Sequence, residues 1–114
     1  MAKDWEIPQL LDAYGPFLTE KQRAITAHYY DEDLSLAEIA ENEGVTRQAV
    51  RDVIRRTEEQ LRDMEEKLQV VARSRADEAA LARLRQAAAD GNPDLAAMVV
   101  AYCDGRRKET EHGV

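Results

Sequence analysis

The sequence predicts an all-α fold, in which a helix-turn-helix bundle is followed by a long C-terminal helical arm. Three observations support this prediction. No segment shows the alternation of apolar and polar residues that is typical of strands. Residues 35–56 have the pattern of two helices joined by a tight glycine turn. Beyond this turn, an apolar stripe recurs at alternating intervals of four and three residues as far as Val71.

Two helices are expected before the motif. Residues 6 to 14 carry apolar side chains at helical spacing, and Pro16 disfavours helix in the residue before it. Thr19, with Gln22 three residues later, has the pattern of a capping box. We therefore expect the second helix to begin after Thr19 and to end at about Tyr30.

The motif itself is expected to begin at Ser35, which forms a second capping-box pattern with Glu38. Gly44 lies at the sharp turn, where a positive φ costs glycine little. Thr46 then caps the second motif helix. The inward-facing side chains are predicted to be Ile39, Ala40, Val45, Val50 and Val53.

The second motif helix is expected to continue as far as about residue 72, much further than a helix-turn-helix requires. Its apolar stripe must pack against something, and two arrangements are possible. Residues 75–102 could fold back over it, or two chains could pair along it. We favour a homodimer, because the fifth helix has only a weak apolar face. The predicted packing residues are Thr57, Leu61, Met64, Leu68 and Val71.

A fifth helix is expected to start at a Ser74 cap and to include residues 76–90, which are rich in alanine. Gly91 and Pro93 then break it, and a last short helix buries Leu95, Met98, Val99 and Tyr102. The chain therefore divides into a helix-turn-helix domain, an arm continuous with the second motif helix, and a polar tail, at residues 1–62, 63–105 and 106–114.

Charge is unevenly distributed along the chain. The formal net charge is −7, which by itself disfavours nucleic-acid binding. Residues 1–45 hold three basic and ten acidic side chains, whereas residues 47–62 hold five arginines and three acids. The only basic island of the sequence therefore coincides with the candidate recognition helix.

This island carries side chains suited to reading DNA. Arginine can donate two hydrogen bonds to guanine, and glutamine can pair with adenine. The candidate base contacts are Arg47, Gln48, Arg51 and Arg55, and the hydroxyls of Ser35 and Thr46 are candidate phosphate contacts. The alternative is that Arg51 and Arg55 form ion pairs along the helix with Asp52, Glu58 and Glu59.

Other classes of function receive little support from the sequence. His28 and His112 stand alone, and no cluster of cysteine and histidine has metal-ligand spacing. We expect no enzyme, no cofactor and no metal. The absence of a long apolar run argues against a membrane span, and the lone Cys103 suits a reducing compartment, so a cytoplasmic protein is expected.

Residues 10–68 resemble the YlxM-like family of helix-turn-helix proteins, and residues 19–62 more distantly resemble region 4 of bacterial sigma factors. The stretches that carry the likeness are LTEKQR at 18–23, YYDEDLSLAEIAE at 29–41, GVTRQAV at 44–50 and the segment that ends in EEKL at 68. The resemblance implies a small bacterial protein with a sigma-region-4-like motif, a long helical arm and no catalytic residues. It also implies a regulatory role in the signal recognition particle pathway.

Two interpretations of function follow. In the favoured one, the motif binds nucleic acid, and DNA is preferred to the particle's RNA because A-form RNA has a major groove too narrow for a helix. In the alternative, the chain is a protein-interaction module that binds a component of the signal recognition particle without touching DNA. The acidic balance of the chain favours this second interpretation.

Overall fold

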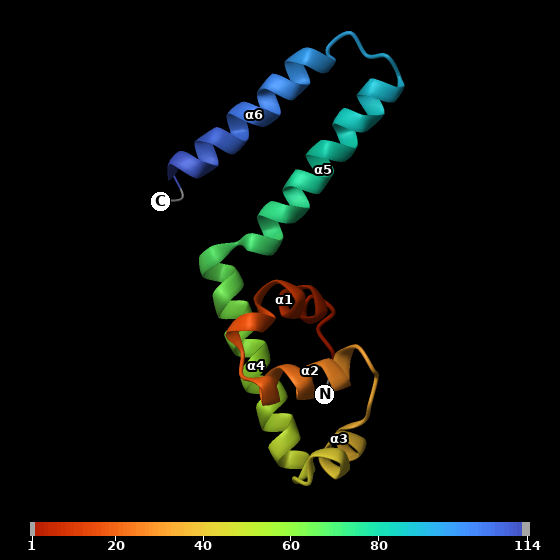
Figure 1. The fold of residues 1–114 in the computed structure, drawn as a ribbon, viewed down its shortest axis with the longest axis vertical. Coiled ribbons are helices and arrows are strands. Elements are labelled where there is room, and N and C mark those ends of the chain that lie inside the picture. Colours follow the sequence, from red (N-terminus) through yellow and green to blue (C-terminus); the bar gives the residue numbers. More distant parts are fainter. Residues whose placement is uncertain (1, 113–114) are drawn as a thin grey trace. The chain divides into compact units, whose positions relative to one another are not determined.

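The computed structural model describes residues 2–112, with side chains as far as residue 107. The described residues are helical and contain no strand, which confirms the predicted all-α fold. They divide into unit 1, residues 1–72, and unit 2, residues 73–114. None of the described helices combines the length and the apolar character that a membrane crossing requires. In chain order the elements are α1 (Ile7–Tyr14), the 3-10 helix η1 (Gly15–Phe17), α2 (Glu20–Tyr30), α3 (Leu36–Glu43), α4 (Arg47–Leu68), α5 (Val70–Ala89) and α6 (Leu95–His112) (Figure 1).

The predicted starts of α2 and α3 are confirmed by their caps. The Thr19 hydroxyl accepts a hydrogen bond from the Gln22 N–H at 3.1 Å, and the Gln22 side chain accepts one from the Thr19 N–H at 3.0 Å. Ser35 and Glu38 form the same reciprocal pair at the start of α3. Each capping box satisfies N–H groups that would otherwise lack partners at a helix start.

Helix α4 is the central element of unit 1, because α1, α2 and α3 all pack against it. Figure 1 shows the three short helices gathered along the length of α4. The motif buries Ile39, Ala40 and Val50, as predicted, while Val45 and Val53 are half-buried at the edge of the core. The fully buried side chains of this core are Ile7, Tyr14, Ile25, Thr26, Ile39, Val50, Ile54, Thr57 and Leu61.

The sequence predicted that residues 75–102 or a second chain would cover the apolar stripe of α4. The structure corrects this prediction, because the helices of unit 1 cover most of the stripe. Thr57 and Leu61 are fully buried inside unit 1, and Met64 and Val71 are half-buried against the same core. Only Leu68, which is 50% exposed, retains substantial free surface. The covering side chains come from α1 and α2. The stripe therefore supplies the core of the bundle, and most of its apolar surface is unavailable to a second chain.

The predicted continuous helix to about residue 72 is also wrong, because α4 ends at Leu68. Gln69 adopts the left-handed conformation with φ 53°, and α5 begins directly after it. The Tyr14 hydroxyl donates to the Glu65 carboxylate at 2.5 Å and accepts from the Val70 N–H at 3.1 Å. The two oxygens of Glu65 accept from the next two N–H groups of α5. Glu65 and Tyr14 thus take the place of an N-cap, so the predicted Ser74 cap lies inside the helix.

Helices α5 and α6 form a hairpin, and its turn lies where Gly91 and Pro93 were predicted to break the helix. Gly91 has φ 65°, and the N–H of Asn92 donates to the carbonyl of Ala87 at 2.9 Å, which closes α5 as a Schellman motif. Two details differ from the expectation. Val99 is 41% exposed instead of buried, and α6 continues through the predicted polar tail as far as His112.

The N-terminal segment is tied to unit 1 by a network of polar side chains. The Tyr30 hydroxyl donates to the Glu58 carboxylate at 2.7 Å, and the Asp4 N–H donates to Tyr30. Arg62 on α4 donates to the Asp4 carboxylate at 2.9 Å. A hydrogen bond from the Glu6 N–H, and then the Arg62 guanidinium, lower the pKa of Asp4 below 3.8. Burial, and then the hydrogen bond to Glu58, raise the pKa of Tyr30.

Candidate nucleic-acid interface

The turn between α3 and α4 sets the geometry of the candidate interface. Gly44 has φ 68° and ψ 34°, the left-handed conformation that a residue with a Cβ atom adopts only at a cost. The N–H of Val45 donates to the carbonyl of Ala40 at 3.0 Å, and the N–H of Gly44 donates to that of Glu41 at 3.3 Å. These bonds close α3 and bring the chain to the start of α4 within three residues.

The hydroxyls of Ser35 and Thr46, predicted phosphate contacts, are both used as helix caps. Thr46 accepts from the Ala49 N–H at 3.0 Å, and Ser35 accepts from the Glu38 N–H at 3.1 Å. Both residues are exposed. A hydroxyl that accepts one hydrogen bond still carries its own proton, so each can donate to a phosphate oxygen while it caps its helix.

The predicted base contacts lie at the start of α4, where the recognition helix of such a motif meets bases. Arg47, Gln48 and Arg55 are exposed, and Arg51 is half-buried at the edge of the core. The Nε atom of Arg51 is buried and has no hydrogen-bond partner among the described residues. Its guanidinium is therefore held close to the helix with unused donor capacity.

The alternative role for these arginines, ion pairing along α4, is not what the structure shows. Asp52 instead accepts a hydrogen bond from the Gln48 amide at 2.9 Å. The Glu58 carboxylate accepts a hydrogen bond from the Tyr30 hydroxyl, and its Oε2 atom lies 3.7 Å from Nη2 of Arg62. Both Glu58 and Arg62 lie beyond the motif at residues 35–56. Within the part of the chain that the structure describes, no carboxylate lies in ion-pairing distance of Arg47, Arg51 or Arg55.

A further arginine, Arg56, shares this property and was not singled out from the sequence. It is exposed and has no ion pair among the described residues. Arg55 and Arg56 line a shallow depression on α4 together with Asp52 and Glu59. The signal that could have identified Arg56 was its place beside Arg55 in the basic island, where either side chain can reach a phosphate.

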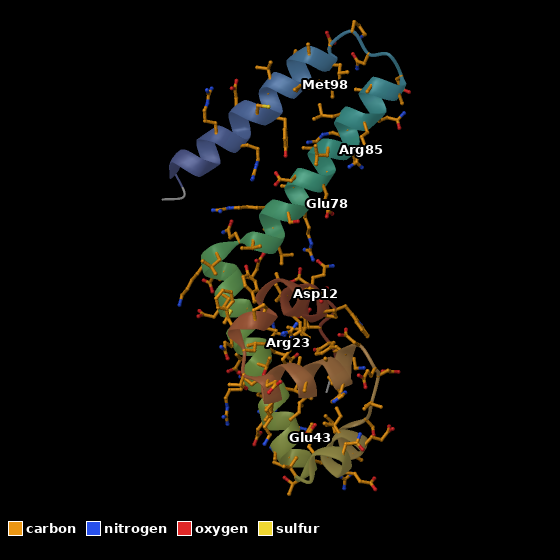
Figure 2. The ribbon with its side chains drawn as sticks, viewed as in Figure 1. Asp12, Arg23, Glu43, Glu78, Arg85 and Met98 are labelled. Carbon is orange, nitrogen blue, oxygen red and sulfur yellow. The ribbon has the colours of Figure 1, made fainter. Side chains whose placement is uncertain are left out.

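Acidic residues flank the basic surface on the side of α3. Glu38, Glu41 and Glu43 are all exposed on this helix, and Figure 2 shows Glu43 at its C-terminal end, just before the turn to α4. Like charge repels phosphate, so α3 lowers affinity for any nucleic acid that approaches it closely. The arrangement confines favourable contact to the arginine-bearing face of α4.

Comparison of the sequence with known proteins places the chain in a family. Residues 1–96 match the family described as "Putative helix-turn-helix protein, YlxM / p13 like", UPF0122. A UPF0122 protein of Clostridium perfringens strain 13 is 41% identical over 113 residues, which is 96% of each chain. One from Lacticaseibacillus casei BL23 is 45% identical over 92 residues, or 81% of each chain. A third, from Clostridium botulinum Alaska E43, is 52% identical over 69 residues, which is 60% of this chain and 63% of that protein.

Proposed function

The chain belongs to the UPF0122 family of YlxM/p13-like helix-turn-helix proteins, and we propose that it is a regulatory protein that binds duplex DNA through the N-terminal half of α4. One observation carries the proposal. The arginines at positions 47, 51 and 55 have no ion-pair partners among the described residues, although the chain contains 23 acidic side chains. Unpaired guanidinium groups on the exposed start of a recognition helix are suited to phosphate and guanine.

In this proposal Arg47, Gln48 and Arg51 face base edges, because the N-terminal residues of a recognition helix enter the major groove. Arg55 lies one turn further along α4 and contacts phosphate. The hydroxyls of Ser35 and Thr46 donate to phosphates on either side. B-form DNA is preferred to duplex RNA, since its major groove of about 12 Å admits a helix. The major groove of A-form RNA is too narrow.

Fluorescence anisotropy with a mixed-sequence DNA duplex at low salt tests this proposal. Each phosphate contact adds about 0.9 to the slope of log affinity against log salt, so wild-type binding should fall steeply as salt rises. The double variant Arg51→Ala/Arg55→Ala should bind on the order of tenfold more weakly and should have a shallower slope. Lys67→Ala is the matched control, because Lys67 lies at the other end of α4 and pairs with Asp63.

Circular dichroism of each variant verifies that unit 1 is still folded. If the double variant binds DNA as tightly as wild type, α4 is not the interface. Preference for an RNA duplex over a DNA duplex of the same sequence would exclude the major-groove mode.

A second candidate is a protein-interaction role in the signal recognition particle pathway, which is implied by the family resemblance. Residues 1–45 carry seven more acidic than basic side chains, so they suit a basic protein partner. Pull-down of particle components with the tagged chain, with nuclease present throughout, tests this role. Direct contact predicts that the association survives nuclease, whereas its loss would mean that nucleic acid bridges the two.

A further inference from the structure

An open apolar groove lies between α5 and α6 in unit 2. Its volume is about 400 Å³. Figure 1 shows that α5 and α6 run antiparallel, and Figure 2 shows Met98 on α6. One end of the groove carries an ion pair between Arg106 and Asp77, at 3.3 Å. The apolar part of its lining consists of Ala76, Ala80, Leu84, Met98, Ala101 and Tyr102.

The hairpin has almost no core of its own. Between residues 73 and 107, where side chains are described, Ala87 alone is buried. The larger apolar side chains on the inner faces, Leu84, Met98 and Tyr102, are only half-buried. About 40 residues that bury so little apolar surface usually require a disulfide, a metal or association to stay folded. A lone cysteine excludes an internal disulfide, and the described residues contain no group of three or more side chains that could hold a metal ion. Association is the remaining common solution.

Apolar surface also continues outward from the groove. Leu81 is 38% exposed and Val99 is 41% exposed. Each lies three residues before a groove residue, Leu84 on α5 and Tyr102 on α6, and so flanks the groove on its own helix. Val100 differs, because it lies about 160° around α6 from Tyr102 at ~100° per residue. Its exposed side chain therefore points away from the groove.

Charge indicates which partner fits this surface. Residues 73–114 contain seven basic and seven acidic side chains, whereas the whole net charge of −7 comes from residues 1–72. Unit 2 therefore adds no net charge repulsion of its own when it meets a copy of itself. A strongly acidic or strongly basic partner would gain no electrostatic attraction from it. The small side chains Ala76, Ala80 and Ala101 leave room for another helix to approach.

We propose that unit 2 is a self-association surface, through which two chains pair hairpin to hairpin as a four-helix bundle. In each chain, Leu81 and Val99 flank the groove that receives the partner. Pairing of this kind would hold two copies of the recognition helix in one particle, as two half-sites on a duplex require. The proposal itself is independent of DNA binding.

Sedimentation equilibrium of the full chain at tens of micromolar tests the proposal. Wild type is expected at twice the chain mass of 12.9 kDa. Val99→Glu places a charge in the interface and should shift the chain to monomer at the same concentration. Val100→Glu is the matched control, because it makes the same substitution at the next residue and should remain a dimer.

Leu81→Glu repeats the test from α5 and should also give monomer. Since Leu81 and Val99 are exposed within one chain, neither change is expected to unfold unit 1, which circular dichroism and Trp5 fluorescence can verify. A monomeric wild type overturns the proposal. So does a Val99→Glu variant that dimerises as wild type does, or a Val100→Glu variant that dissociates equally. A monomeric variant that still binds a short duplex would separate this result from the DNA-binding proposal.

Discussion

Units 1 and 2 are both helical, but different interactions hold their helices in place. Unit 1 buries side chains from four helices in one core, around Ile25, Ile54 and Leu61. Unit 2 buries only Ala87 among its described side chains, although its alanine-rich α5 favours helix strongly. Helix propensity favours α5 locally, whereas unit 1 has the buried core that gives a cooperative fold.

This difference also separates the proposed roles of the two regions. A recognition helix must present side chains in a fixed geometry, and α4 is held in place by packing against α1, α2 and α3. A self-association surface must keep apolar side chains available until a partner arrives. The partly exposed Leu81 and Val99 of unit 2 meet that requirement.

The largest expected effect comes from truncating the core of unit 1. Leu61→Ala removes a fully buried side chain and should lower the free energy of unfolding by roughly 2–5 kcal/mol. Leu68→Ala, on the same stripe but 50% exposed, should change it by less than about 0.5 kcal/mol. Urea unfolding followed by Trp5 fluorescence measures both. Equal effects would contradict the assignment of Leu61 to the core and Leu68 to the surface.

A smaller effect is expected at the two glycines with positive φ, one in each unit. Gly44 has φ 68° and Gly91 has φ 65°, and a Cβ atom added at either position would meet no neighbouring atom within 4 Å. Alanine should therefore cost only the left-handed conformation, about 1 kcal/mol at each position. Gly44→Ala should lower the unfolding midpoint reported by Trp5, whereas Gly91→Ala should reduce helicity in far-ultraviolet circular dichroism and leave that midpoint unchanged. A shift of the midpoint by Gly91→Ala would show that the units unfold together.

The polar network of unit 1 should give a pH-dependent effect of less than about 1 kcal/mol, since Asp4 and Arg62 are both partly exposed. The pKa of Asp4 is lowered in the folded chain, so its contribution is present above pH 3.8 and is lost as pH falls through the lowered value. Asp4→Asn should therefore be less stable than wild type at neutral pH and equally stable in strong acid. Asp12→Asn, at an exposed position on α1, is the control for charge alone (Figure 2). A difference between Asp4→Asn and wild type that does not vary with pH would contradict the assignment.

The smallest effect is expected from Thr57, whose buried hydroxyl has no hydrogen-bond partner among the described residues. Thr57→Val replaces the hydroxyl with a methyl group of similar size and should raise the free energy of unfolding by zero to about 1 kcal/mol. Thr57→Ser, which keeps the hydroxyl and removes the methyl group, should lower it by about 1 kcal/mol. Destabilisation by both substitutions would indicate that the hydroxyl has a partner in solution.

Local sequence signals predicted the ends of several helices correctly. A capping box requires one hydroxyl and one amide or carboxylate three residues apart, and both occurrences, at Thr19 and Ser35, form in the structure. Gly44 and Gly91 end their helices for a similarly local reason. The prediction that α4 begins after Thr46 is confirmed in the same way. The candidate contacts Arg47, Gln48 and Arg55 are exposed, but whether they touch nucleic acid stays a prediction.

The sequence by itself thus determined the helical fold class, the motif and the position of the basic island, because these depend on residues within one or two turns of each other. The tertiary structure alone decided which side chains cover the stripe of α4 and where that helix ends. It also decided that the carboxylates of the described residues lie beyond ion-pairing distance of Arg47, Arg51 and Arg55. Tyr14, which helps to hold the break at Gln69, lies 51 residues before Glu65. Leu61 and Tyr14 meet in one core only after α1 has folded back onto α4. A pattern read over neighbouring residues contains no information about contacts made across such a distance.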